Sequence, residues 1–162
     1  MGELIQVGMA EIKLAAPPDK LMTAGLGSCI GMCLFEPQLR IASMSHIMLP
    51  QSPAGGAAGN PGKYADTAII AALAAMKKVG VVPQRLVAKI VGGAQMFLYA
   101  GSNSDIFNIG ERNSIAVRKS LTENRIKLLG EDVGGNSGRT VIFDPATGDL
   151  LIRTINQGEK VI

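Results

Sequence analysis

Apolar residues along the chain fall into short runs, most of them bounded by glycine, proline or a few polar residues. Runs of this length predict β-strands rather than long helices. Turns are predicted at 17–19 and 144–149, and a loop rich in glycine, alanine and proline at 51–62. The segments predicted to be extended are 9–15, 21–23, 29–35, 41–49, 86–91, 126–129, 139–143 and 150–154.

Two further segments show helical spacing instead. Between 63 and 79 small and apolar residues recur every three or four positions, and Gly80 follows as a predicted C-cap. A second helix is predicted over 112–124. Two helices among short strands and hairpins favour an α+β fold, in which two main helices cover a mixed or antiparallel sheet. Because the 162 residues contain no repeat and no linker, we expect a single domain spanning 1–162.

Composition and charge then exclude several classes of protein. A hydrophobic content of 47% with 18% charged residues is typical of a globular domain. The net charge of +3 comes from scattered lysines and arginines, which predicts no nucleic-acid binding. The longest apolar run, 67–76, is too short to cross a bilayer, and the N-terminal residues do not form a secretory signal. We therefore expect a cytoplasmic protein without membrane insertion.

The chemistry-bearing residues are few. The chain has two cysteines, Cys29 and Cys33, and one histidine, His46, so any histidine-dependent chemistry must use His46. Two cysteines do not make a disulfide framework, and both are expected to be thiols. Cys29 follows Gly25-Leu26-Gly27-Ser28, where small residues permit a sharp turn. The N–H groups of Gly27 and Ser28 are therefore candidate donors to an oxyanion.

The spacing of Cys29 and His46 predicts that they meet across a β-hairpin. If the turn is formed by 36–39, paired positions sum to 75, and Cys29 directly opposes His46 with Cβ atoms about 5 Å apart. A register shift of two leaves the pair diagonal on one face, whereas a shift of one separates them. A histidine at this distance is expected to lower the pKa of the thiol and to act as its base.

A third group should orient the histidine, and the residues alone leave it open between Thr23, Ser43 and Ser45. Two other hypotheses also stay open. Ser28 is an alternative nucleophile, although no carboxylate is placed to complete a serine triad. Cys29, Cys33 and His46 are an alternative zinc site, which strand spacing disfavours.

At these residues the chain resembles the chemoreceptor glutamine deamidases, the CheD family. Each matching segment is weak alone, but six of them in order, over nearly the whole length, are specific. The segments are Gly25-Leu26-Gly27-Ser28-Cys29, Ser45-His46-Ile47-Met48-Leu49-Pro50, Pro61-Gly62-Lys63-Tyr64-Ala65-Asp66, Lys89-Ile90-Val91-Gly92-Gly93-Ala94-Gln95-Met96-Phe97, Ile109-Gly110-Glu111-Arg112-Asn113 and Gly134-Gly135-Asn136-Ser137-Gly138-Arg139.

The resemblance implies a Cys-His-Thr triad, with Cys29 as nucleophile, His46 as base and Thr23 as the orienting group. It implies hydrolysis of glutamine side chains to glutamate through a Cys thioester, on the helical cytoplasmic region of chemoreceptors (methyl-accepting chemotaxis proteins). Glutamyl methyl esters are a second implied substrate. No cofactor and no metal are implied. The family also implies a partner, the CheC-type phosphatase, and hence an alternative role as a regulatory binding module that stimulates this phosphatase.

The remaining signatures have structural interpretations as well. The glycine loops at 92–94 and 134–136 are either walls of a cleft or tight turns. Glu111-Arg112-Asn113 is expected to open a helix. The loop 51–62 is either a lid over the substrate or an exposed tip.

Overall fold

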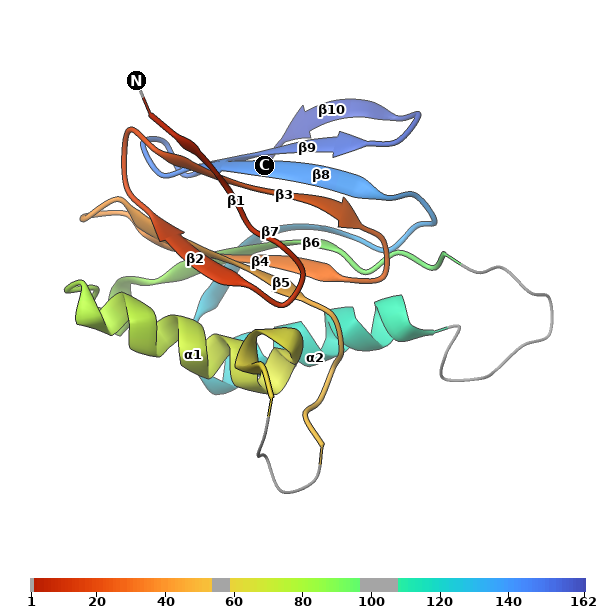
Figure 1. Ribbon diagram of the computed structural model, residues 1–162, viewed down its shortest axis with the longest axis horizontal. Helices are drawn as coiled ribbons and strands as arrows, with labels where there is room; N and C mark the ends of the chain where they lie inside the picture. Colours follow the sequence, from red (N-terminus) through yellow and green to blue (C-terminus); the bar gives the residue numbers. More distant parts are fainter. Residues whose placement is uncertain (1, 54–58, 97–107) are drawn as a thin grey trace.

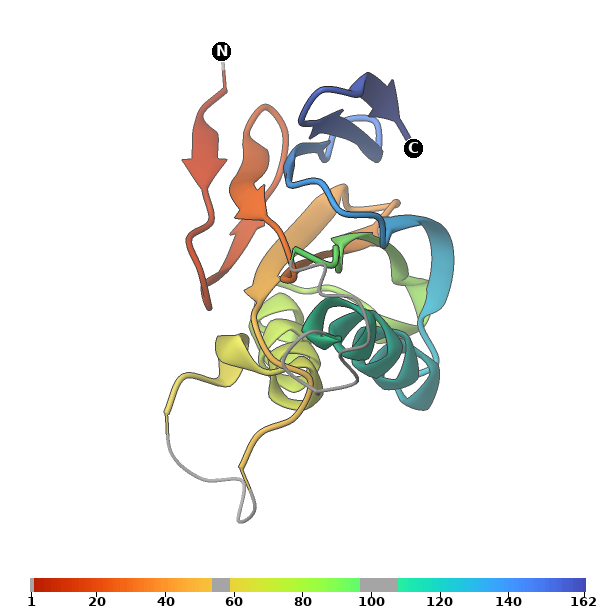
Figure 2. The ribbon, with the colours of Figure 1, turned by 90° about the vertical axis from the view of Figure 1, so that its right-hand side faces the viewer.

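The computed structural model describes residues 2–53, 59–96 and 108–162. They form a single α+β domain of stacked layers: an outer sheet, a central sheet and a layer of two helices (Figure 1). Figure 2 shows these layers from the side. The outer sheet contains, in spatial order, β1 (Leu4–Gln6), β3 (Lys20–Leu26), β8 (Arg139–Asp144), β9 (Asp149–Thr154) and β10 (Gly158–Val161).

The central sheet lies between the outer sheet and the helices. Its strands, in spatial order, are β2 (Ile12–Ala15), β5 (Ile41–Ile47), β4 (Ile30–Glu36), β6 (Val87–Gly92) and β7 (Lys127–Val133). Both sheets are mixed, because β1 pairs parallel to β3 and β6 pairs parallel to β7, while the other neighbours are antiparallel. The helices are α1 (Ala65–Lys78) and α2 (Ile109–Glu123), with short 3-10 turns at Pro61–Lys63 and Pro83–Arg85.

Alternation along β4 explains why the central sheet is buried on both faces. Ile30, Met32 and Leu34 pack in the core shared with the helices. Cys33 packs in the second core, between the two sheets. Successive side chains of a strand point to opposite faces, so one strand contributes to both cores.

The two predicted helices and the mixed pairing are confirmed, but the strands divide into two sheets rather than one. The sequence prediction missed β1 and β10, which have only three and four residues. β10 reads Gly-Glu-Lys-Val and is exposed throughout, so it has no apolar alternation to detect. The interpretation of 51–62 as a lid falls partly on residues 54–58, which lie outside the described residues.

The predicted register of the hairpin is wrong by two residues. The last pair before the turn is Glu36 with Ile41, so paired positions sum to 77 and Gly31 opposes His46. The carboxylate of Glu36 accepts a hydrogen bond from the N–H of Leu39 at 2.8 Å. Glu36 is therefore the last residue of the strand, and the turn begins after it. A shift of two preserves the face on which each side chain lies.

Candidate functional site

The predicted site residues come from both sheets, and two of them, Thr23 and His46, meet between the sheets. Thr23 lies in β3 of the outer sheet, and His46 lies in β5 of the central sheet. Their side chains are fully buried, with exposures of 0% and 1%. Cys29 lies in the loop just before β4 rather than in the strand, and it is half-buried. The histidine is thus held inside the protein, while the thiol lies at the margin of the core.

A hydrogen bond between the sheets fixes the protonation of the imidazole. Thr23 Oγ1 lies 2.7 Å from His46 Nδ1 and 2.6 Å from the carbonyl oxygen of Val7. A carbonyl only accepts, so the single hydroxyl proton of Thr23 is donated to Val7. Thr23 Oγ1 must therefore accept from His46, which places the imidazole proton on Nδ1. In the neutral ring, Nε2 then carries a free lone pair.

The other ring nitrogen of His46, Nε2, is the candidate base. His46 Nε2 is buried and makes no hydrogen bond to any described residue. Gly31 opposes His46 across the hairpin, and Cys29 precedes Gly31 by two residues, just outside the paired strand. Cys29 packs against the core between the sheets, which is also the side on which Thr23 meets His46. Cys29 and His46 therefore lie on the same side of the central sheet, although no hydrogen bond joins Nε2 to the thiol among the described residues. Of the two cysteines, Cys29 is the less buried.

Glycines at two points make room for this arrangement. A Cβ at Gly31 would lie 3.1 Å from Leu26 Cδ1 and 3.6 Å from Thr23 Cγ2, so a larger residue would crowd the group that orients the histidine. Gly92 has a φ of 119° and brings its backbone close to the loop, because a Cβ there would lie 2.1 Å from the carbonyl oxygen of Cys29. Only glycine is compatible with both demands at position 92.

The loop before β4 contains candidate donors to an oxyanion. The carbonyl of Gly27 accepts from Ala94 N–H at 2.8 Å, and that of Cys29 accepts from Gly93 N–H at 2.9 Å. The N–H of Gly27 donates to Gly25 at 3.0 Å, so the interpretation of Gly27 as an oxyanion donor loses support. The N–H groups of Ser28 and Cys29 donate no hydrogen bond to any described residue. Adjacent N–H groups in a turn are donors of the kind that bind anions in proteins, so these two are candidates for an oxyanion site.

Burial acts on both members of the thiol–imidazole pair and keeps them neutral. It lowers the pKa of His46 below the ordinary 6.5 and raises the pKa of the Cys29 thiol above the ordinary 9.0. The lowered thiol pKa expected from the sequence is therefore wrong, because loss of water disfavours the thiolate. Both directions favour a neutral thiol and a neutral imidazole at neutral pH.

The alternative candidates fit the geometry less well. Ser43 and Ser45 are odd-numbered neighbours of His46 on β5, so their side chains lie on the opposite face of the strand and cannot orient the ring. Within 2–53, 59–96 and 108–162, no three His, Cys, Asp or Glu side chains come together as metal ligands, which gives the zinc hypothesis no support. The orienting partner of His46 is a hydroxyl rather than the carboxylate of a serine triad.

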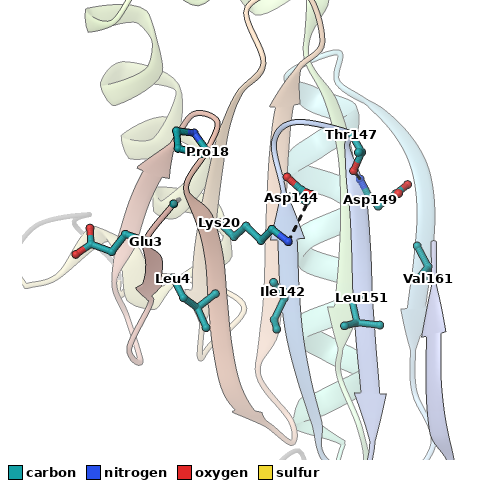
Figure 3. Close-up of a pocket in the computed structure, with 11 residues that line it drawn as sticks. Glu3, Leu4, Pro18, Lys20, Ile142, Asp144, Thr147, Asp149, Leu151 and Val161 are labelled. Atoms are coloured by element: carbon teal, nitrogen blue, oxygen red, sulfur yellow. Dashed lines mark hydrogen bonds and ion pairs between the residues drawn. The ribbon is translucent and has the colours of Figure 1, made fainter.

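A separate hollow of about 610 Å³ lies on the uncovered face of the outer sheet (Figure 3). Ile142 and Leu151 line it in paired positions on β8 and β9, and Lys20 forms an ion pair with Asp144 across 3.7 Å at its side. None of the residues lining it carries a thiol or an imidazole. The hollow therefore lacks the cysteine and histidine that the predicted chemistry needs, and it is distinct from the site between the sheets.

Comparison with known proteins places the chain among proteins of chemotaxis. A family model described as CheD, chemotactic sensory transduction, matches residues 48–154. The chain is 56% identical to a probable chemoreceptor glutamine deamidase CheD of Syntrophomonas wolfei and 48% identical to the chemoreceptor glutamine deamidase CheD of Halalkalibacterium halodurans. Both alignments cover all of this chain and all of the relative. The chain belongs to the CheD family.

The match to the family model begins after Thr23, Cys29 and His46, whereas the full-length relatives span these positions. A solved structure of a Neisseria meningitidis protein, of the family DUF152, has a similar fold with a TM-score of 0.50 and 9% identity. The similarity covers 83% of this chain and 64% of that protein, and at this identity it concerns the fold alone. In the described residues no helix is long and apolar enough to span a membrane.

Proposed function

We propose that this protein is a chemoreceptor glutamine deamidase, which hydrolyses glutamine side chains of its substrate protein to glutamate and ammonia. Cys29 is the nucleophile, His46 the proton carrier and Thr23 the group that orients His46. The observation that carries the proposal is the Thr23–His46 hydrogen bond of 2.7 Å, which leaves Nε2 unprotonated and without a partner among the described residues. Cys29 packs against the same core between the sheets. The full-length relatives named as deamidases supply the reaction and the substrate.

In the first half of the reaction, the thiol of Cys29 attacks the carbon of the glutamine side-chain amide. His46 Nε2 accepts the thiol proton, and the C=O bond opens to an oxyanion. The free N–H groups of Ser28 and Cys29 stabilise this oxyanion, with Ser28 retained from the sequence prediction and Cys29 taking the place of Gly27. His46 then returns the proton to the amide nitrogen as the oxyanion collapses. Ammonia departs, and the acyl group remains on Cys29 as a thioester.

In the second half, water replaces ammonia. His46 Nε2 takes a proton from the water, the hydroxide attacks the thioester carbon, and the thiolate leaves. The proton on His46 returns to sulfur, which restores the neutral pair, and the released side-chain carboxylic acid loses its proton to solvent to give glutamate. A glutamyl methyl ester follows the same steps with methanol as the first leaving group. These steps use no cofactor and no metal.

The proposed substrate is the helical cytoplasmic region of a methyl-accepting chemotaxis protein, and we place the enzyme in the cytoplasm with it. The direct test is mass spectrometry of a receptor fragment after incubation with the protein. Each glutamine converted to glutamate adds about one dalton, because an NH₂ group is replaced by OH. A receptor fragment with no mass change, under conditions in which both proteins are folded, would reject the function.

Replacing Thr23 by valine removes the hydroxyl while keeping the shape and the strand preference of the side chain. Because Nδ1 then has no acceptor, the imidazole loses its fixed tautomer, and we expect kcat to fall by about 10- to 100-fold. NMR of the single imidazole should show protonation moving from Nδ1 toward Nε2. Thr23→Ser retains the hydroxyl and is the matched control, with activity close to wild type. A valine variant with wild-type kcat would remove Thr23 from the mechanism.

The neutral pair predicts a characteristic pH dependence. Deamidation should be lost as pH falls through the lowered pKa of His46, below 6.5, because the imidazolium cannot accept the thiol proton. Alkylation of Cys29 by iodoacetamide should rise about tenfold per pH unit from neutral pH to beyond 9.0, since the raised pKa keeps the thiol protonated. Cys33 does not interfere, because burial raises its pKa to about 12. A rate of alkylation that is flat between about pH 6 and about pH 8 would indicate a preformed thiolate and contradict this account.

Stimulation of a CheC-type phosphatase stays a prediction from the family resemblance. It can be separated from catalysis with one variant. Cys29→Ala should abolish deamidation, and phosphatase stimulation that survives in this variant would establish a second, non-catalytic role. Phosphatase activity that does not respond to the wild-type protein would remove that role.

A further inference from the structure

One buried amide connects the two halves of the site. Asn113 lies in α2 and has an exposure of 0%. Its Nδ2 donates to the carbonyl of Ser28 at 2.9 Å and to the carbonyl of Met48 at 3.0 Å. Ser28 immediately precedes the proposed nucleophile, and Met48 follows His46 by two residues. A single side chain on a helix therefore ties the loop that carries the thiol to the end of the strand that carries the base.

The orientation of this amide is unambiguous. A flipped side chain would place Oδ1 of Asn113 against two carbonyl oxygens, which only accept hydrogen bonds. In the orientation present, Oδ1 is buried and has no partner among the described residues. An unpaired buried acceptor lowers the free energy of unfolding. The site therefore keeps two N–H donors at this position at the expense of stability.

These bonds determine where the free N–H groups of the loop point. In a trans peptide the C=O group of one residue and the N–H group of the next point in opposite directions. Asn113 holds the carbonyl of Ser28 toward α2, so the N–H of Cys29 points away from the helix. In the same way, Ala94 holds the carbonyl of Gly27 and thereby directs the N–H of Ser28.

We propose that Asn113 is a positioning residue of the oxyanion site, which aims the N–H of Cys29 at the oxygen of the tetrahedral intermediate. The inference rests on the proposed function. Asn113 touches neither substrate nor thiol; it acts through the Ser28–Cys29 peptide. Without it, the Ser28 carbonyl has no side-chain donor to hold it and the peptide can rotate. The oxyanion then loses a preorganised donor, whereas the thiol of Cys29 and the imidazole of His46, which exchange the proton, are unchanged.

The test uses Asn113→Leu, which matches the shape of asparagine but donates no hydrogen bond. We expect kcat for deamidation of a receptor fragment, per folded protein, to fall by about 10- to 100-fold with KM within about twofold. The rate of Cys29 alkylation and its pH profile should stay at wild type, because alkylation forms no oxyanion. Affinity for a substrate peptide carrying an aldehyde in place of the side-chain amide should fall with kcat, since the hemithioacetal oxygen occupies the oxyanion site.

Ser120→Ala is the matched control on the same helix. Ser120 is buried and donates from Oγ to the carbonyl of Ala65 at 3.2 Å, so its loss weakens packing of α2 without touching the loop. We expect a lowered Tm with unchanged kcat. If Asn113→Leu does not fold, Asn113→Ser, with a single shorter donor, replaces it. The fall in kcat should be smaller, again with an unchanged rate of Cys29 alkylation.

The outcomes separate the two proposals. A wild-type protein that does not deamidate the receptor fragment overturns the proposed function. An active wild-type protein together with an Asn113→Leu variant of unchanged kcat overturns the role of Asn113 alone. A parallel fall in kcat and alkylation rate also overturns it, because it would indicate collapse of the whole site.

Discussion

Replacement of Cys29 by alanine is expected to abolish deamidation of a receptor fragment, with a fall in kcat of about 10³- to 10⁶-fold. The reason is that no other group in the proposed site can form the acyl intermediate: the hydroxyl of Ser28 lacks a carboxylate–histidine pair, and His46 is paired with Thr23 instead. The fold should be little affected, because Cys29 is half-buried at the margin of the core. The measurement is the rate of mass increase of the fragment, with thermal unfolding measured in parallel.

Cys33→Ala is the matched control for the cysteine. Cys33 is 1% exposed and lies in the core between the sheets, so its replacement should lower stability by about 1 kcal/mol and leave kcat within about twofold. The pair of variants also tests the zinc hypothesis, which requires both cysteines. Activity that survives in Cys29→Ala, or is lost equally in Cys33→Ala, would contradict the assignment of the nucleophile.

Replacement of His46 by glutamine is the second large effect, with an expected fall in kcat of about 10²- to 10⁴-fold. Glutamine is polar and of similar length, so it limits the loss of packing between the sheets, but it cannot accept and return a proton at neutral pH. The rate constant for deamidation should therefore collapse in a variant that still unfolds cooperatively.

A spectroscopic control is possible because His46 is the only histidine in the chain. NMR of the wild-type imidazole should show a pKa below the ordinary 6.5, and deamidation should be lost as this one ring becomes protonated. A His46→Gln variant that retains more than about a tenth of the wild-type kcat would show that His46 is not the base.

The sequence predicted that Cys29 and His46 lie on the same face of the sheet, because strand alternation constrains the face of a side chain even when the register is uncertain. The register itself was wrong by two, since the decisive interaction is the turn closed by Glu36 and Leu39, a local hydrogen bond that hydrophobic patterning does not encode. The hairpin thus kept both residues on one face despite the error.

The partner of His46 could not be derived from spacing. Thr23 lies on the outer sheet, and periodicity along a strand does not tell which other sheet will cover it, so only the family resemblance selected Thr23. The carbonyl of Val7, which decides the tautomer, has no side-chain signal at all. Asn113 appeared only as a polar residue near a helix start, and its two contacts join segments 65 and 85 residues away in sequence.

The central claim is that the sulfur of Cys29 forms a covalent bond with the side chain of a substrate glutamine. It can be tested with a receptor peptide in which the target glutamine is replaced by its diazoketone analogue. A thiol that binds next to this group is alkylated by the diazo carbon, and N₂ is lost. Peptide mapping of the inactivated protein should find one adduct, on Cys29, and native receptor fragment should slow its formation. An adduct on Ser28 or Cys33, or an active enzyme that forms none, would contradict the account.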